Sequence, residues 1–187
     1  MPKVASRIKH KHEKPHGSAK PCWVEVRFPE SYGQGTNFLH GRHNSNRLKI
    51  TYFNNKIDGA FMAKVWFGPD AEGPPGYAHG GSIAAVLDEA MGLAVWSKGF
   101  RAVSARIEID YKLLLPLKTT AIVKMWVHRS KGRKVVAKGR VMNTDGTIYS
   151  EARGLFISID PARFGILSEK MDQAEQRKQF RNKKEPD

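Results

Sequence analysis

Residues 73–97, GPPGYAHGGSIAAVLDEAMGLAVWS, join a Gly/Pro-rich loop directly to a helical pattern. From Ile83 to Val95 the apolar residues recur at steps of three and four, which is the period of one buried helix face. No longer helical pattern precedes the C-terminal tail, and alternating strand patterns lie on both sides of this one. We therefore predict one long helix that packs its apolar face against a sheet.

Two glycines, Gly80 and Gly81, stand where this helix begins, and Ser82 follows as the N-cap, or as N1 or N2 if the helix starts at the glycines. The first turn of a helix leaves backbone N–H groups without partners at the positive end of the helix dipole. Because glycines carry no side chain that would keep a ligand away, an oxyanion or phosphate has room to bind there. The alternative is that both glycines only form a tight turn into the helix.

Asp88 lies on the same helix at the edge of the apolar face, beside Val95, whereas Glu89 lies on the polar side as a solvated charge. Small residues surround Asp88 at three and four steps, which leaves room for a ligand beside its carboxylate. Partial burial disfavours the charged form of a carboxylate and suits it to act as a general base, the alternative being an ordinary boundary residue. We predict substrate contacts at the glycine turn and around Asp88, from Gly81, Ala84, Met91 and Gly92.

Six segments alternate apolar and polar residues in the manner of half-buried strands. They cover residues 47–53, 60–67, 102–113, 117–129, 133–142 and 147–159. Two of these segments precede the long helix and four follow it. An antiparallel sheet wrapped around one central helix buries all of these apolar faces, so we predict an α+β fold.

The His-Gly-Gly motif at residues 79–81, followed nine positions after the histidine by Asp88, resembles the hotdog-fold acyl-CoA thioesterases. The resemblance is to the phenylacetate-pathway type and to the human thioesterase-superfamily proteins, and the loop Glu72–His79 is similar to the human mitochondrial branch. It covers residues 44–160. It implies a single hotdog domain and a homodimer or tetramer whose sites lie at the subunit interface.

In such enzymes an Asp of the central helix activates water or attacks the thioester, and the amide of the first Gly after the His polarises the carbonyl. A Ser or Thr on the strand after the helix assists the Asp. By position, this resemblance assigns these catalytic roles to Asp88, Gly80 and Ser104, with His79 shaping the glycine turn. It therefore implies hydrolysis of acyl-CoA to a free carboxylic acid and CoA. The alternative is a non-catalytic acyl-CoA or acyl-carrier-protein binding protein on the same fold.

Two features depart from this resemblance. The family often has an Asn or Gln upstream of the His, but position 73 here is Gly. Strict alternation along residues 102–113 also places Ser104 on the polar face with Arg106 and Glu108, away from the helix. Ser104 can serve the site only if the strand bulges or starts after it, or if the site lies at a subunit interface.

Charge bears on the partners of the chain. It holds 32 Lys and Arg against 18 Asp and Glu, a net charge of +14, which attracts polyanions such as CoA, acidic carrier protein or nucleic acid. No recognised nucleic-acid-binding motif is present, so we do not expect nucleic acid as a partner. Residues 1–43 are predicted to form a basic, partly disordered N-terminal extension, and residues 161–187 a charged tail with a marginal helical pattern.

The remaining composition indicates a cytoplasmic location. No run of eighteen apolar residues is present, so we expect no membrane span, and the N-terminus lacks the apolar segment of a secretory signal. The lone Cys22 excludes an internal disulfide and fits a reducing compartment. His10, His12 and His16 have no further ligands at a recognised spacing, so we expect neither a metal site nor another cofactor.

Overall fold

The computed structural model describes three stretches of the chain, residues 22–26, 38–39 and 46–160. Most of the predicted N-terminal extension, residues 1–43, and all of the predicted tail, residues 161–187, lie outside them. The long helix α1 spans Gly80–Ser97, and a short 3-10 helix, η1, spans Pro69–Ala71. Within the described residues, no helix is both long enough and apolar enough to cross a bilayer.

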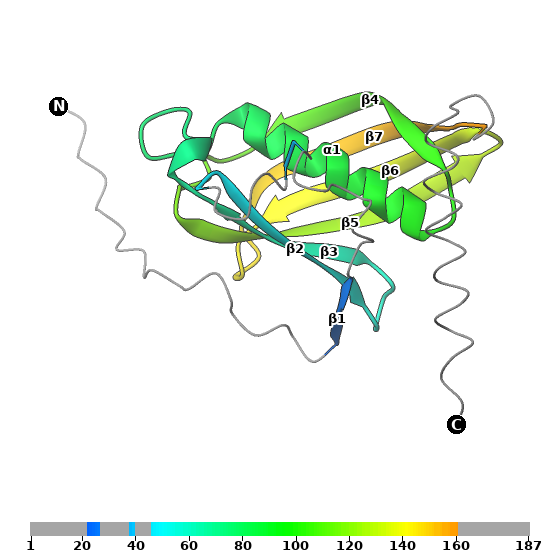
Figure 1. Ribbon diagram of the computed structural model, residues 1–187, viewed down its shortest axis with the longest axis horizontal. Helices are drawn as coiled ribbons and strands as arrows, with labels where there is room; N and C mark the ends of the chain where they lie inside the picture. The colour runs from blue at the N-terminus through cyan, green and yellow to red at the C-terminus, as the bar shows by residue number, and fades with distance from the viewer. Residues whose placement is uncertain (1–21, 27–37, 40–45, 161–187) are drawn as a thin grey trace.

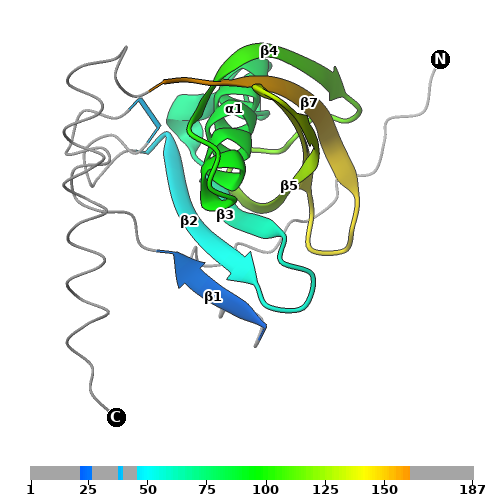
Figure 2. The ribbon, with the colours of Figure 1, turned by 90° about the vertical axis from the view of Figure 1, so that its right-hand side faces the viewer.

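The described strands form one sheet in which all neighbouring pairs are antiparallel. Their bounds are β1 (Trp23–Val26), β2 (Leu48–Asn55), β3 (Phe61–Phe67), β4 (Ala102–Tyr111), β5 (Thr119–Lys131), β6 (Lys134–Met142) and β7 (Ile148–Ser158). The order across the sheet is β1-β2-β3-β5-β6-β7-β4, which places β4 at one edge. Helix α1 runs along the sheet (Figure 1), and the sheet curves around it (Figure 2).

The hydrophobic core lies between the concave face of the sheet and the apolar face of α1. Val86, Leu87 and Val95 of the helix are fully buried there, together with Phe67 and Phe156 of the sheet. Full burial of such side chains contributes about 1.5–3 kcal/mol each, so this packing holds α1 in place. These buried helix residues recur at the steps of three and four from which the apolar face of the helix was predicted.

Glycines of the sheet allow the helix to lie close to β6 and β7. A Cβ atom on Gly139 would lie 3.1 Å from Leu87 Cδ2, and one on Gly154 would lie 2.6 Å from the Phe156 ring. Met91 fills the remaining space, since its side chain lies within 3.3 Å of both Cβ positions and is fully buried. Met91 is therefore a core residue in this chain.

The α+β hotdog fold predicted from the sequence is confirmed, and each of the six predicted strands is present within a few residues of its expected bounds. One strand was missed. Strand β1 pairs with β2 from Trp23↔Asn55 to Val26↔Tyr52, so the sheet begins upstream of the boundary predicted at residue 44. With four residues and only one polar position, Glu25, β1 is too short to show a clear alternation.

Strand β4 carries a β-bulge that decides where Ser104 lies. Ser104 pairs with Phe156 and Arg106 with the adjacent Leu155, so Ala105 is the extra residue. The bulge shifts the alternation by one residue. Ser104 therefore shares the helix-facing side with Ile107 beyond the bulge, which packs against the core. The expectation that strict alternation turns Ser104 away from the helix is wrong for this reason.

Candidate active site

The first turn of α1 is capped by His79. Its imidazole Nδ1 accepts a hydrogen bond from Gly81 N–H at 2.9 Å. The His79 carbonyl accepts hydrogen bonds from the Ser82 amide at 3.0 Å, from the Ser82 hydroxyl at 2.7 Å and from the Ile83 amide at 3.3 Å. The N-cap is therefore His79, and Ser82 is N3, the third residue of the helix, one position beyond the N1 or N2 predicted from the sequence.

Gly80 N–H differs from the other amides of this turn, because no described residue accepts a hydrogen bond from it. The amides of Gly81, Ser82 and Ile83 are all bound to His79. Gly80 N–H is thus the first-turn donor that remains open to a ligand, at the positive end of the helix dipole. The amide of Gly81, a predicted substrate contact, is occupied by the cap.

Positions 80 and 81 are glycines for different structural reasons. A Cβ on Gly81 would lie 2.9 Å from His79 Nδ1 and would displace the capping side chain. A Cβ on Gly80 would meet only Tyr111, at an ordinary contact distance of 3.5 Å, and Gly80 does not have a positive φ. Neither packing nor backbone conformation within the described residues therefore requires a glycine at position 80, where it keeps the N–H approachable.

Gly73 occupies the position where the family often has an Asn or Gln, and the packing of the loop explains why this residue has no side chain. A Cβ on Gly73 would lie 2.7 Å from the His79 Cα, so any side chain would force the loop apart. The loop is held in this shape by backbone hydrogen bonds from His79 N–H to the Ala71 carbonyl at 2.7 Å and from Ala78 N–H to the Leu115 carbonyl at 2.8 Å. A polar side chain at position 73 is therefore excluded by this loop.

Asp88 and Ser104 come together in the structure. The Ser104 hydroxyl donates a hydrogen bond to the half-buried Asp88 carboxylate, across the bulge of β4. Burial raises the pKa of Asp88 above its ordinary value, and the neighbouring charge of Glu89 raises it further, while the Ser104 hydrogen bond partly opposes both. The result is a carboxylate that accepts a proton more readily than a solvated Asp.

Glu89 is more constrained than the sequence indicated. It is half-buried, and its Oε1 accepts a hydrogen bond from the hydroxyl of the buried Tyr52 at 2.9 Å. The interpretation of Glu89 as a solvated charge was therefore wrong, because a tyrosine on β2 reaches the polar side of the helix. Its charge lies beside Asp88 in a fixed place.

Gly80 and Asp88 are not close to one another within this chain. They lie eight residues apart on one helix, which corresponds to about 12 Å along its axis. A single carbonyl group cannot contact both the Gly80 amide and the Asp88 carboxylate over that distance. The predicted catalytic groups thus form two separate halves: Gly80 with His79, and Asp88 with Ser104.

The predicted substrate contacts beside Asp88 are placed differently from one another. Ala84 and Gly92 are half-buried on α1. Met91 is fully buried in the core, so a ligand would contact it only if the core opened. The contact roles of all three stay predictions.

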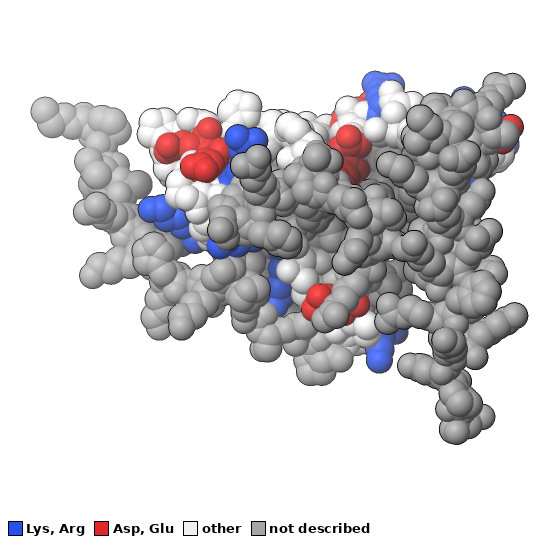
Figure 3. All heavy atoms as spheres, in the orientation of Figure 1, with Lys and Arg blue, Asp and Glu red and all other residues white. Residues whose placement is uncertain are grey.

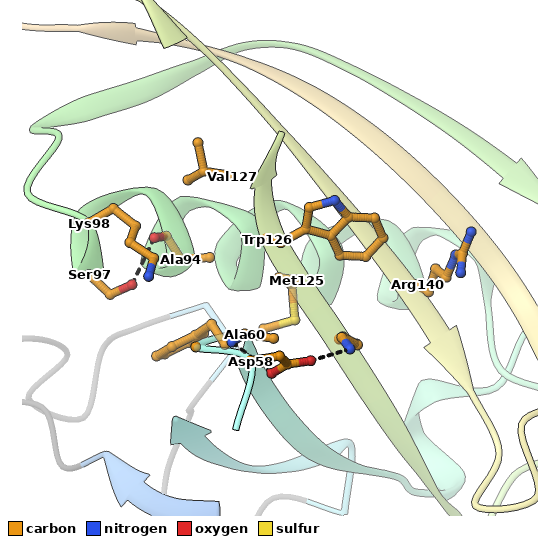
Figure 4. Close-up of a pocket in the computed structure, with 12 residues that line it drawn as sticks. Asp58, Ala60, Ala94, Ser97, Lys98, Met125, Trp126, Val127 and Arg140 are labelled. Atoms are coloured by element: carbon orange, nitrogen blue, oxygen red, sulfur yellow. Dashed lines mark hydrogen bonds and ion pairs between the residues drawn. The ribbon is translucent and has the colours of Figure 1, made fainter. Parts of the chain in front are cut away.

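A cavity of about 550 Å³ lies at the C-terminal end of α1 (Figure 4). Its walls include Ala94, Ser97 and Lys98 of the helix end, together with Asp58 and Lys124, which form an ion pair at 2.7 Å. None of the predicted catalytic residues lines it. This cavity is therefore distinct from the candidate site.

Charged side chains are mixed on the face of the molecule drawn in Figure 3. Where the described residues form this face, Lys and Arg lie in separate groups and Asp and Glu lie between them. Nucleic-acid-binding domains instead gather basic residues on one face or along one element. The described residues visible on this face show no such gathering.

Comparison with known proteins gives relatives of one kind. The model of the thioesterase superfamily matches residues 75–150. Acyl-coenzyme A thioesterase THEM4 of Xenopus laevis is 35% identical over 163 residues, which cover 78% of this chain and 72% of that protein. The THEM4 protein of Rattus norvegicus is 29% identical over 133 residues, covering 71% of this chain and 57% of that protein. The chain spans little more than half the length of its rat, mouse and cattle relatives.

Solved structures agree with the fold. A hypothetical thioesterase protein from Streptococcus pneumoniae, crystallised with coenzyme A, superposes with a TM-score of 0.53 at 20% sequence identity. The match covers 60% of this chain and 88% of that one.

Proposed function

Because this chain belongs to the thioesterase superfamily, we propose that it hydrolyses acyl-CoA thioesters to a free carboxylic acid and CoA. The observation that carries the proposal is the half-buried Asp88, whose raised pKa and Ser104 hydrogen bond suit proton abstraction from water. The names of the relatives, acyl-coenzyme A thioesterases, support the same substrate class.

In the proposed reaction, Asp88 takes a proton from water as the water oxygen bonds to the thioester carbonyl carbon. The carbonyl oxygen becomes an oxyanion. As the oxyanion re-forms the carbonyl, the C–S bond breaks, and Asp88 returns its proton to the departing sulfur, so that CoA leaves as the thiol and the free acid remains. Direct attack by the Asp88 carboxylate, followed by hydrolysis of the anhydride, is the other route open to the same residue. On either route Ser104 orients the carboxylate through its hydrogen bond.

We propose that the Gly80 amide donates the hydrogen bond that stabilises the oxyanion. That N–H is open among the described residues, lies at the positive end of α1, and is flanked by peptide groups already held by His79. A donor fixed before the reaction stabilises developing charge without reorganising during it. Gly81 contributes no second donor, because its N–H is bound to His79 Nδ1.

A complete site needs two copies of the chain. The distance of about 12 Å between Gly80 and Asp88 places the oxyanion donor and the base of one copy too far apart for one thioester. We therefore propose a homodimer, or a tetramer built from dimers, in which Gly80 of one copy faces Asp88 of the other.

The exposed edge of β4 is the surface proposed for this dimer. Among the described strands β4 pairs only with β7, and a free edge is a template for another strand. One end of β4 holds Ser104 beside Asp88, and the other end holds Tyr111 against Gly80. Antiparallel pairing of two β4 strands about a twofold axis brings opposite ends together. It thereby moves Gly80 of one copy towards Asp88 of its partner.

The activity is tested by following thiol release with a chromogenic disulfide reagent across a panel of acyl-CoAs. Wild type and Asp88→Asn are compared, with Asp145→Asn as a control that changes an exposed Asp in the turn between β6 and β7. We expect turnover by wild type and Asp145→Asn and a loss of about 10²–10⁴-fold in Asp88→Asn. Near-normal turnover by Asp88→Asn would remove Asp88 from the mechanism.

The shared site is tested by complementation. Co-expression of Asp88→Asn with Gly80→Pro, which lacks the amide hydrogen, gives mixed dimers in which one of two sites is intact. Random pairing predicts recovery of about a quarter of the wild-type activity. If each chain holds its own complete site, mixing the two variants restores nothing.

The alternative function is a non-catalytic binding protein for acyl-CoA or acyl carrier protein. It would show as tight binding of acyl-CoA, measured by calorimetry, with no thiol release by wild type on any member of the panel. We also propose a cytoplasmic location, because the unpaired Cys22 fits a reducing compartment. Imaging of the tagged full-length protein tests it, and enrichment in an organelle would contradict it.

A further inference from the structure

Tyr111, the last residue of β4, contacts the glycine turn at the start of α1. Its hydroxyl donates a hydrogen bond to the Gly80 carbonyl oxygen at 2.9 Å, between residues 31 positions apart in the sequence. Its ring lies 3.5–3.6 Å from the position that a Cβ on Gly80 would occupy. The β4 bulge lets Tyr111 and Ser104 face the helix together, because these residues are seven positions apart and would fall on opposite faces of a regular strand.

The hydrogen bond of Tyr111 completes a clamp on one peptide group. The carbonyl of the Gly80–Gly81 peptide is held by Tyr111, and the N–H of the same peptide is held by His79 Nδ1 at 2.9 Å. A peptide group is a rigid plane, so holding both of its ends fixes its orientation. The preceding peptide is also fixed, since its carbonyl, that of His79, accepts three hydrogen bonds.

These contacts leave Gly80 N–H as the one polar group of the two peptides without a partner among the described residues. Two consecutive glycines form the most flexible backbone that a chain can have, and a donor for an oxyanion is effective only when its direction is set in advance. The Gly80 N–H belongs to the peptide whose carbonyl is held at His79, and the Gly80 Cα joins that peptide to the Gly80–Gly81 peptide, so a restraint on the second peptide also limits rotation of the donor. His79 supplies the restraint on one side, and Tyr111 is the residue that supplies it from the sheet.

We propose that Tyr111 is a positioning residue that holds the Gly80–Gly81 peptide and thereby aims the Gly80 N–H at the thioester carbonyl. The inference rests on the proposed function for its catalytic part, whereas the clamp itself is a property of the chain. A phenol keeps its proton at neutral pH, and burial raises the pKa of Tyr111 further above its ordinary value, so the hydroxyl is a hydrogen-bond donor there.

A purely structural role would give a different outcome. Half of the Tyr111 side chain is exposed, and its ring would then act only as an apolar cover for the edge strand or as a contact with a second copy. Those roles depend on the ring and not on the hydroxyl. Replacement by Phe keeps the ring at Gly80 and removes only the hydrogen bond, so Tyr111→Phe separates the two roles.

The kinetic test compares wild type with Tyr111→Phe, and Tyr149→Phe is the matched control from the neighbouring strand β7. For Tyr111→Phe we expect kcat to fall about fivefold to tenfold, the effect of one neutral hydrogen bond. The KM for acyl-CoA and the inhibition constant of free CoA should stay within about twofold, because binding does not depend on the aim of the donor. Tyr149→Phe should match wild type in all three quantities.

Three results would overturn the proposal: an unchanged kcat in Tyr111→Phe, a rise in KM with kcat unchanged, or an equal loss in Tyr149→Phe. The oligomeric state and thermal midpoint of each variant are measured alongside, and a change of assembly in Tyr111→Phe that accounts for the lost activity would also overturn it. Wild type without activity on any acyl-CoA removes the proposed function and the catalytic part of this inference together.

A second measurement tests the clamp without using activity. In protein labelled with ¹⁵N-glycine, amide hydrogen exchange of Gly81 reports how firmly its N–H is held by His79. Loss of the Tyr111 hydroxyl should loosen the shared peptide and speed this exchange about fivefold, while Gly139 in the core exchanges as before. Unchanged exchange at Gly81 would show that Tyr111 does not restrain the turn.

Discussion

Replacement of Gly80 by proline removes the proposed oxyanion donor and leaves the local fold able to form. Proline has no N–H, and at the first position of a helix that N–H has no partner in the helix in any case. Gly80 is the first residue of α1, and His79 before it has φ −65° and ψ 136°, the extended conformation that a residue before proline prefers. The Cβ has space, since it meets only Tyr111 at 3.5 Å.

The expected effects on stability and rate are opposite. A proline that fits the native backbone restricts the unfolded chain and stabilises the fold by about 0.4–1 kcal/mol. For a chain of 187 residues this raises the thermal midpoint by about 1–4 °C. Loss of one oxyanion donor lowers kcat by about 10²–10³-fold. Gly80→Pro should therefore be a protein of normal or higher stability with very little turnover.

Gly80→Ala is the matched control, because it adds the same Cβ and keeps the N–H. Thermal unfolding followed by circular dichroism and thiol release from acyl-CoA are measured for both variants and for wild type. We expect Gly80→Ala to keep kcat within about fivefold of wild type, since no described atom is crowded by its methyl group. If Gly80→Pro turns over as fast as Gly80→Ala, the Gly80 amide does not bind the oxyanion. A large drop in the midpoint of Gly80→Pro would instead show that this turn is not a proline-compatible helix start.

Three further variants follow from the same contacts. Ser104→Ala removes the hydrogen bond that lowers the pKa of Asp88, so the acid limb of the pH profile of kcat/KM should move to higher pH; an unmoved limb would contradict the contact. Because burial holds the pKa of Asp88 above 3.8 in the folded state, its ionisation costs stability, and Asp88→Asn should raise the thermal midpoint at pH 7 by about 1–3 °C. That gain should vanish below about pH 4, where the carboxyl is protonated in both the folded and unfolded states. Gly81→Ala should lower the midpoint by about 2–4 °C, the loss of one helix cap, because its Cβ displaces His79; an unchanged midpoint would show that the cap survives.

The fold could be predicted from the sequence because its periods are strong. The step of three and four along α1 matches residues that are fully buried, including Val86, Leu87 and Val95. The alternation along the later strands gave their bounds to within a few residues. Such patterns arise because one face of each helix or strand is buried, so the residue types along the element alternate between apolar and polar with its period.

Contacts between distant elements could not be predicted in this way. The hydrogen bond of Tyr52 to Glu89 joins residues 37 positions apart, and that of Tyr111 to Gly80 joins residues 31 apart. Neither residue type nor spacing signals such a pair. The bulge at Ala105 belongs to the same class, because alanine is compatible with a regular strand and with a bulge.

The bulge also shows why a single displaced residue matters to the proposed chemistry. Without it, a strand that faces Ser104 towards Asp88 would turn Tyr111 away from α1, because these residues are seven positions apart and fall on opposite faces of a regular strand. With Ala105 inserted, both side chains face the helix, one at the carboxylate and the other at the glycine turn. One irregularity in β4 therefore lets the same edge strand support both halves of the site that we propose two chains complete.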